Sequence, residues 1–348
     1  MKELKDSKWF DVEYLPKEYI FSKEYRPGNL DSPVCDSIPV IDLSKVNGHV
    51  NSVEAIVKAS KEFGTYLNLF DSIPGYSDSI PVTKQVINHG IPEKKVNDAM
   101  NVLKEFFNMS SKETHTKGWI YTNSTDYAKD GVHLWRENLK HPCHPIEDCI
   151  HLWPDNPTRY QEVISAYLVE IQKLSLRILE LISEGLGLKS GYFKDMSEVQ
   201  LLSSNIYPPC PDPSLTLGIL PHQDPSLITL LYQGQSNGLQ VMKDGQWINV
   251  GAIPNAFVVN IGNQLEIISN EKLKSVKHRV VNSTNETRLS IATFVNPSPD
   301  TIIEPAKVLV NEMEPSRYTP KQYKEYVQYN NAFGEYTVAI QNALRSKN

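Results

Sequence analysis

Three residues in the second half of the chain have the types and spacing needed to hold a metal ion. His222 and Asp224 are two positions apart in a run that reads as a β-strand, so their side chains share one face while Gln223 points away. A second histidine, His278, lies in a later strand-like run. Two imidazoles and one carboxylate leave open positions on an octahedral Fe(II), which is the facial triad of non-haem iron oxygenases. We therefore expect these three residues to form an iron site.

Two further polar pairs repeat this spacing of two residues. Arg288 and Ser290 share one face of a late strand-like run, where a guanidinium and a neighbouring hydroxyl can bind a carboxylate. Asn205 and Tyr207 have the same arrangement on an earlier run. Taken alone, Arg288 is explained equally well by a surface ion pair, and Tyr207 by an ordinary half-buried tyrosine. The order of the three pairs along successive strands favours a common site.

The chain after about residue 199 predicts a β-rich core. Short apolar runs alternate with turns rich in Pro, Gly, Asn and Asp, at a spacing typical of a sandwich or jelly roll. The expected strands are 201–207, 218–224, 227–232, 239–242, 247–250, 256–261, 274–281 and 288–295.

The chain before this core predicts supporting helices. Apolar residues recur at helical spacing in 52–63, 92–108 and 157–184, short strands are expected at 38–43 and 85–91, and 320–347 is helical again. No segment has the composition of a linker. We expect one compact α+β unit with three regions, which are an N-terminal helical region (1–199), a jelly-roll core (200–300) and a C-terminal segment with a helix (301–348).

Composition limits the partners and the compartment. The formal net charge of −6 and the pI of about 5.9 argue against a nucleic-acid partner and favour a small-molecule substrate. No apolar run approaches the roughly 20 residues of a membrane-spanning helix, and neither end carries a recognisable targeting signal. The four cysteines form no CxxC pair, which indicates reduced thiols. We expect a cytoplasmic monomer without a membrane partner.

Longer stretches of the chain resemble those of the plant 2-oxoglutarate- and Fe(II)-dependent dioxygenases. They cover most of residues 38–330, and the family fold implied is a distorted double-stranded β-helix, a jelly roll with helical support. The stretches are IPVIDLS, QVINHGIP, SNIYPPCPDP, LPHQDPSLITLL, GLQVMKDGQWINV, AFVVNIGNQLEIISN, KSVKHRVV and RLSIATF.

This resemblance implies a role for each polar residue and a reaction. The reaction consumes O2 and 2-oxoglutarate, releases succinate and CO2, and hydroxylates, desaturates or cyclises a small molecule, with ascorbate as reductant. The residues implied are His222, Asp224 and His278 as ligands of Fe(II); Arg288 and Ser290, helped by Tyr207 and Asn205, for the distal carboxylate of 2-oxoglutarate; and Phe294 near the substrate.

The substrate is indicated only as a class. The stretches LWRENLKHPCHP and WPDNPTRYQEV are similar to the alkaloid-hydroxylating branch typified by hyoscyamine 6-hydroxylase. The HQDPSLITLL core is closer to the flavanone 3-hydroxylase and salicylate hydroxylase branches. We therefore expect a plant specialised metabolite, either an alkaloid or a phenolic or flavonoid compound.

The stretch 65–84 departs from the family pattern. Relatives run from the equivalent of residues 62–64 almost directly into the strand that begins at Gln85, whereas here TYLNLFDSIPGYSDSIPVTK intervenes. The stretch is either a loop extruded from the start of the strand or translated intron sequence in a form that folds poorly. Because the metal residues lie far along the chain, we expect them to be unaffected.

Other readings stay open beside this one. A 2-oxoglutarate-independent non-haem iron oxidase would use the same triad, with Arg288 and Ser290 serving another carboxylate. A non-catalytic binding relative would need neither set of residues. A zinc site in HPCHPIEDCIH is a weaker candidate, because its Cys and His spacing matches no standard structural site.

Overall fold

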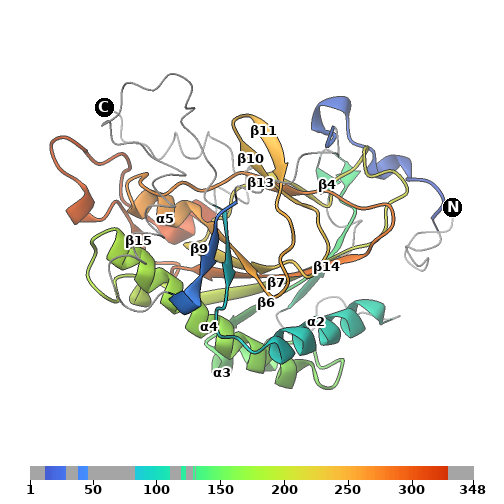
Figure 1. Ribbon diagram of the computed structural model, residues 1–348, viewed down its shortest axis with the longest axis horizontal. Coiled ribbons are helices and arrows are strands. Elements are labelled where there is room, and N and C mark those ends of the chain that lie inside the picture. Colours follow the sequence, from blue (N-terminus) through green and yellow to red (C-terminus); the bar gives the residue numbers. More distant parts are fainter. Residues whose placement is uncertain are drawn as a thin grey trace.

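Two β-sheets face each other, and helices cover the outer side of the larger one (Figure 1). The computed structural model describes residues 12–28, 38–45, 83–109, 119–122, 128–129 and 131–327. The larger sheet has eight strands in the order β1-β2-β12-β9-β14-β7-β6-β3, and the smaller has four in the order β11-β10-β13-β8. This mixed helix and sheet architecture confirms the predicted α+β fold with a jelly-roll core.

The strands of both sheets are short, apart from three neighbouring strands of the larger sheet, β14, β7 and β6. The larger sheet contains β1 (Val40–Asp42), β2 (Thr83–Ile87), β3 (Ile120–Thr122), β6 (Glu137–His144), β7 (Val199–Tyr207), β9 (Ile228–Tyr232), β12 (Phe257–Ile261) and β14 (Arg288–Asn296). The smaller contains β8 (Ile219–His222), β10 (Leu239–Lys243), β11 (Gln246–Asn249) and β13 (His278–Val280). Two separate pairs are β4 (Ala128–Lys129) with β5 (Val132–His133) and β15 (Ile302–Ile303) with β16 (Lys321–Gln322).

The centre of the larger sheet is the most firmly buried part of the core. All five residues of β9 and all five of β12 are buried. One face of these strands packs on helices, and the other is turned toward the smaller sheet. Beside β9, the strands β14 and β7 pair in antiparallel register from Arg288↔Tyr207 to Asn296↔Val199. A nine-residue register of this kind places opposite side chains on one face at fixed positions.

Two long helices support this sheet from outside. The helices α2 (Glu93–Asn108) and α4 (Tyr160–Gly185) pack against each other below β6 and β7 in Figure 1. In α4 the buried residues recur at three- and four-residue spacing, as an amphipathic helix requires. The shorter helices are α3 (Ile146–Cys149) and α5 (Asn263–Ile268), and the 3-10 turns are η2 (Lys17–Tyr19), η3 (Lys23–Tyr25), η4 (Leu43–Lys45), η5 (Ile150–Leu152), η6 (Lys194–Met196) and η7 (Lys307–Leu309).

The structure corrects several element boundaries. The strand expected at 85–91 is β2, which begins at Thr83 inside the interrupting stretch and ends at Ile87, because Asn88 has a φ of 51°. The strand β6 was missed, since its sequence ENLKHPCH contains a proline and has no alternation of apolar and polar residues. The expected strands at 218–224 and 274–281 are shorter, at Ile219–His222 and His278–Val280.

Some expectations fall on residues outside those described. The helix expected at 52–63 lies there entirely, as do 65–82 of the interrupting stretch and most of the tail expected at 320–347. Among the described residues, no helix combines the length and apolar character needed to cross a membrane. Cys143, Cys149 and Cys210 are free buried thiols.

Candidate active site

His222, Asp224 and His278 converge where β8 ends and β13 begins. The two histidines stand directly opposite each other in the antiparallel pair of β8 with β13, and Asp224 follows β8 by two residues. The Asp224 Oδ1 atom lies 3.6 Å from His222 Nε2 and 3.5 Å from His278 Nε2. Within the described part of the chain, this is the one group of His, Cys, Asp and Glu whose ligand atoms are close enough to hold a metal, all within 4.8 Å of one another.

Both imidazoles are held with Nε2 ready to ligate. The Nδ1 atom of His222 lies 2.8 Å from the Leu220 carbonyl oxygen, and Nδ1 of His278 lies 3.0 Å from that of Val276. A carbonyl oxygen only accepts, so each Nδ1 carries the proton and each Nε2 keeps its lone pair. Burial, followed by the neighbouring His278, lowers the pKa of His222 to about 4, which favours the neutral ligand.

This donor set fits Fe(II). Two imidazole lone pairs and a carboxylate oxygen that is almost fully buried point at a common position, which is unfavourable unless a cation lies between them. Two nitrogens and one oxygen on one side of an ion leave the opposite side free, as an oxygen-using iron centre requires. The residues present therefore suit the metal that the sequence predicts.

Asp224 is supported by a chain of contacts that reaches the interrupting stretch. Its Oδ2 atom accepts a hydrogen bond of 3.4 Å from Asn260 Nδ2, and Asn260 Oδ1 accepts one of 3.3 Å from Thr83 Oγ1. Its backbone carbonyl accepts from the Asn263 amide at the start of α5. Thr83 therefore lies two hydrogen bonds from a predicted iron ligand, and the expectation that 65–84 leaves the metal residues unaffected stays a prediction.

Arg288 is a buried cation with two donors that no described residue accepts. Its Nη1 atom donates to Ser290 Oγ at 3.2 Å, whereas its Nε and Nη2 atoms have no hydrogen-bond partner. The guanidinium lies 5.1 Å from the centre of the Tyr207 ring. Leaving a charged donor both buried and unpaired is costly, so this geometry is suited to an anion such as a carboxylate.

Tyr207 and Asn205 come from β7 and stand opposite Arg288 and Ser290 on β14. The Tyr207 ring is accommodated by Gly218, where an added Cβ would lie 2.6 Å from a ring carbon. The structure therefore brings all four polar residues expected to bind 2-oxoglutarate onto adjacent strands, on one face.

Phe294 is half-buried further along the same strand. It shares the face of Arg288 and Ser290 by alternation, but lies six residues beyond Arg288, about 20 Å along the strand. It packs against the hydrophobic core cluster. Its place near the substrate stays a prediction.

Sequence reasoning missed Arg136 and Asn138, which reach this site from β6 and the residue before it. Arg136 Nη1 donates to Asn205 Oδ1 at 2.7 Å, and Asn138 Nδ2 donates to the same oxygen at 3.1 Å. The signal was available, because Arg136 and Asn138 have the same spacing of two residues as the other pairs. The spacing alone does not mark a site, because the sequence of β6 lacks the alternation that predicts a strand.

The histidines and cysteines of HPCHPIEDCIH do not form a metal group among the described residues. His141 is buried, with Nε2 at 2.8 Å from the Tyr160 hydroxyl and Nδ1 at 2.9 Å from the Pro142 carbonyl. Burial also raises the pKa of the Cys143 thiol well above its usual range. These contacts agree with a structural role for His141 and Cys143.

Comparisons with known proteins give the family. The model of the 2OG-Fe(II) oxygenase superfamily matches residues 197–297. Hyoscyamine 6-dioxygenase of Hyoscyamus niger is 40% identical over 85% of this chain and 86% of its own length. Flavanone 3-dioxygenase 2 of Oryza sativa subsp. japonica is 35% identical over 90% of this chain and 89% of its own. The solved structure of JOX2 in complex with 2OG, Fe and JA is 31% identical, with a TM-score of 0.80 over 99% of this chain and 96% of that one.

The chain therefore belongs to the 2-oxoglutarate- and Fe(II)-dependent oxygenase superfamily. It is an enzyme of the plant type, a dioxygenase that uses Fe(II) and 2-oxoglutarate on a double-stranded β-helix fold. The family, the fold and the reaction class predicted from the sequence are confirmed.

Proposed function

We propose that His222, Asp224 and His278 hold the Fe(II), and that Arg288 and Ser290 bind 2-oxoglutarate with help from Tyr207 and Asn205. The observation that carries this assignment is the buried Arg288 guanidinium, whose Nε and Nη2 donors have no partner among the described residues. A carboxylate would satisfy both donors at once, and 2-oxoglutarate carries one at each end.

Iron held by the triad would supply the redox chemistry by which O2 converts 2-oxoglutarate into succinate and CO2 while the substrate is oxidised, with ascorbate as external reductant. The protein groups bind and orient the metal ligands and the cosubstrate. The Leu220 and Val276 carbonyls keep the two imidazoles in the ligating tautomer. Asn260 restrains the Asp224 carboxylate. Because Arg288 is almost fully buried, its attraction for a carboxylate is screened little by water.

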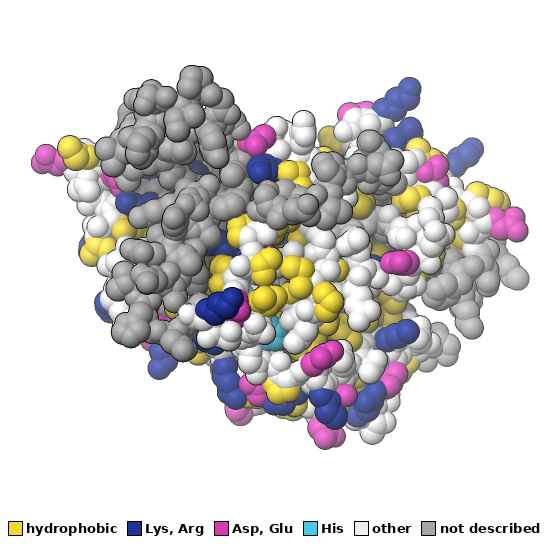
Figure 2. Space-filling model, viewed as in Figure 1, with side chains coloured by type: hydrophobic (Ala, Val, Ile, Leu, Met, Phe, Trp, Pro, Cys, Tyr) yellow, Lys and Arg dark blue, Asp and Glu magenta, His cyan; other side chains and the backbone are white. Residues whose placement is uncertain are grey.

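The substrate we propose is a small plant specialised metabolite, either an alkaloid or a phenolic or flavonoid compound. The names of the relatives support both classes, since one acts on hyoscyamine and another on a flavanone. Apolar side chains gather in the middle of the face shown in Figure 2. An apolar surface there suits a weakly polar molecule. Phe294 is proposed to lie near it.

The test is succinate formation by the full chain with Fe(II), 2-oxoglutarate and ascorbate, with and without a panel of alkaloids, flavonoids and phenolic acids. We expect one compound class to stimulate succinate formation and to be hydroxylated, desaturated or cyclised. Asp224→Ala should abolish this turnover. The matched control Asp98→Ala, at an exposed carboxylate of α2, should leave it unchanged.

The opposite outcomes separate the two rival classes. Oxidation of a panel compound without any requirement for 2-oxoglutarate would replace the proposal with a 2-oxoglutarate-independent oxidase. Retention of ligand binding by Asp224→Ala, with no turnover by either form, would favour a non-catalytic binding relative.

Three further predictions rest on the sequence. They are the cytoplasmic location, the monomeric state and the division into regions 1–199, 200–300 and 301–348. The low cysteine content supports the first, and the absence of a linker-like segment supports one compact unit. Light scattering of the purified chain measures the oligomeric state directly.

A further inference from the structure

A row of polar side chains crosses three neighbouring strands of the larger sheet. In Figure 1 the strands β6, β7 and β14 lie side by side. Asn138 of β6 stands opposite Asn205 of β7, and Asn205 stands opposite Ser290 of β14. Residues directly opposite in antiparallel strands project from the same face. Asn205 is therefore flanked on both sides within the sheet.

The amide of Asn205 can adopt only one orientation among these neighbours. An arginine has no acceptor, so the 2.7 Å contact from Arg136 Nη1 must end on the Asn205 oxygen. The NH2 group of Asn138 donates to the Ser204 carbonyl at 2.9 Å, which can only accept, and the same NH2 group lies 3.1 Å from Asn205 Oδ1. Two independent donors thus fix the oxygen of Asn205 on the β6 side.

The NH2 group of Asn205 consequently faces away from β6. Among the described residues, the side-chain hydrogen bonds of Asn205 are those that its Oδ1 atom accepts from Arg136 and Asn138. The side chains nearest along the sheet on the other side are Ser290, which is directly opposite, and then Arg288, beside Tyr207. The NH2 group of Asn205 and the unpaired Nε and Nη2 donors of Arg288 can therefore bind the same anion.

We propose that Arg136 and Asn138 are positioning residues, which hold the Asn205 amide with its NH2 group toward a carboxylate of 2-oxoglutarate. The inference rests on the proposed binding of 2-oxoglutarate by Asn205. A reversed amide would present its oxygen to the anion, and two like partial charges would then repel. Fixing the amide in advance avoids that state and removes the ordering cost when the anion binds.

A second way for Arg136 to act is directly, through its charge on the anion. The two modes differ in how they depend on Asn205. A positioning residue has nothing to hold once the amide is gone, whereas a charge keeps its attraction. A double-mutant cycle between Arg136 and Asn205 separates them.

The experiment is an anoxic titration of 2-oxoglutarate into the Fe(II)-loaded full chain, followed by the absorption band that appears when a keto acid chelates Fe(II). The variants are Arg136→Met, Asn205→Ala, their double combination and Asn138→Leu. The matched control is Arg159→Met, at an exposed ion pair with Glu105. Thermal unfolding and Fe(II) affinity, measured on the same samples, identify variants that keep the native fold and the metal site.

We expect Arg136→Met, Asn138→Leu and Asn205→Ala each to weaken 2-oxoglutarate binding about 5- to 20-fold, while Fe(II) affinity stays within about twofold. Arg136→Met should add nothing in the Asn205→Ala background. A further loss of the full size there would overturn the positioning role. Should Arg136→Met fail to fold, Asn138→Leu in the Asn205→Ala background tests the same coupling.

A further variant, Arg288→Met, separates this inference from the proposed function. If Arg288→Met abolishes binding but Asn205→Ala and Arg136→Met bind as the wild type does, only the positioning inference fails. If Arg288→Met binds 2-oxoglutarate normally, the proposed cosubstrate site itself is wrong.

Discussion

Two buried cations lie on the same eight-stranded sheet, and their surroundings differ completely. Arg288, on β14, is 3% exposed, and Lys84, on β2, is 6% exposed. Burial lowers the pKa of both side chains, that of Lys84 to about 7. Arg288 stands among Ser290, Tyr207 and Asn205, on strands whose register fixes all four. Lys84 ends the stretch that departs from the family pattern and lies among apolar side chains.

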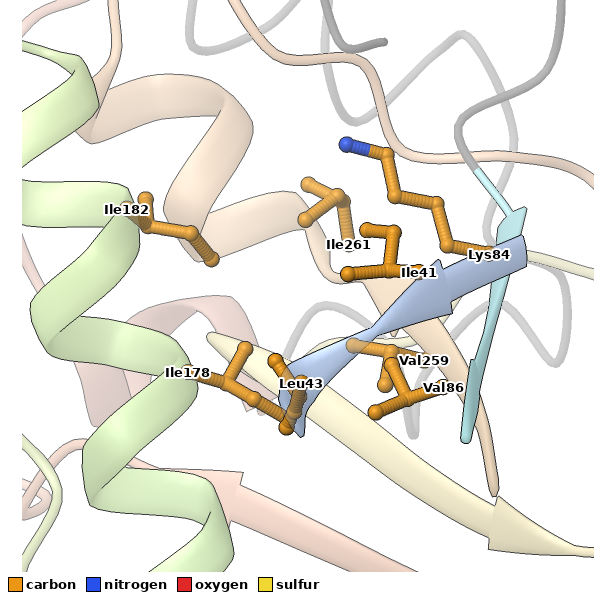
Figure 3. Close-up of a pocket in the computed structure, with 8 residues that line it drawn as sticks. All are labelled: Ile41, Leu43, Lys84, Val86, Ile178, Ile182, Val259 and Ile261. Atoms are coloured by element: carbon orange, nitrogen blue, oxygen red, sulfur yellow. The ribbon is translucent and has the colours of Figure 1, made fainter. Parts of the chain in front are cut away.

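The surroundings of Lys84 are those of a hydrophobic core. The cavity that it lines is otherwise apolar, with Ile41, Leu43, Val86, Ile178, Ile182, Val259 and Ile261. Figure 3 shows these side chains converging from β1, β2, β12 and α4, with the Lys84 amine at the end away from Leu43 and Ile178. A charged amine in such a place is penalised by desolvation, which lowers its pKa.

Burial of a charge therefore has different consequences at Arg288 and at Lys84. Beside β7 the neighbours of the cation are polar and aimed at a common point, so the cost of burial is offset when an anion binds. Beside β1 the side chains that line the cavity with Lys84 are aliphatic, and burial there disfavours the charged amine. The chemistry of the neighbours, rather than the burial itself, distinguishes a candidate binding residue from a destabilising one.

The largest effect is expected at the first cation. Arg288→Met should weaken 2-oxoglutarate binding by more than about 100-fold, because it removes a desolvated charge from a carboxylate. Arg288→Lys keeps the charge but not the two-pronged geometry, so it should recover only part of the affinity. Anoxic titration of the Fe(II)-loaded chain measures both, with Arg159→Met as control. Equal binding by Arg288→Met and the wild type would show that Arg288 does not bind 2-oxoglutarate.

At Lys84 we expect removal of the cation to be favourable, with an effect on stability. Lys84→Met should raise the free energy of unfolding at pH 7, because it removes an amine whose pKa is lowered to about 7 by burial. Between the folded pKa of about 7 and the ordinary value of 10.5, the unfolded chain binds more protons than the folded one, so wild-type stability rises with pH. The advantage of Lys84→Met should then shrink by up to about 1.4 kcal/mol per pH unit over that window.

Denaturant unfolding at several pH values measures this difference between Lys84→Met and the wild type. Lys94→Met is the matched control, because that lysine is exposed on α2 and forms an ion pair with Asp98. Parallel stability curves for the wild type and Lys84→Met would show that the amine is not desolvated in the folded protein.

A smaller effect should connect the two regions. Asn260→Ala should lower the affinity for Fe(II) about tenfold, since it removes the donor that restrains Asp224. Thr83→Val acts only through Asn260, so its effect should be at most about threefold. Co(II), titrated by its visible absorption, can replace Fe(II) in this measurement, and Asn311→Ala on a distant turn is the control. A larger loss in Thr83→Val than in Asn260→Ala would contradict the order of contacts.

The smallest effect is expected at Gln223, between two of the predicted ligands. Its Nε2 atom donates to the Ser275 carbonyl at 2.8 Å, away from the triad. Gln223→Val should therefore change metal affinity by less than about twofold. The same Co(II) titration applies, and a tenfold loss would mean that the residue shapes the metal site directly.

The parts of the site that follow strand alternation were predictable from the sequence. His222 with Asp224, Asn205 with Tyr207 and Arg288 with Ser290 each occupy positions two apart, and a period of two decides the face. The structure brings the members of these pairs together, and their chemical roles stay predictions. The family resemblance added which ligand each pair would bind.

What could not be predicted depends on long-range register and on atypical strands. The contact between Thr83 and Asn260 joins residues 177 positions apart, and no local pattern reports it. Arg136 and Asn138 went unnoticed because β6 lacks the alternation that marks a half-buried strand. The burial of Lys84 could not be read either, since lysine is rarely placed in an apolar core.

The triad and the Arg288 group should form a single site, and one measurement tests this directly. Fe(II) and 2-oxoglutarate should each tighten the binding of the other by the same factor, because the keto acid would contact both the metal and Arg288. Anoxic titrations of 2-oxoglutarate with and without Fe(II), and of Fe(II) with and without 2-oxoglutarate, give the two factors. We predict equal factors above about tenfold, lost in Asp224→Ala. Independent binding of the two ligands would contradict the account.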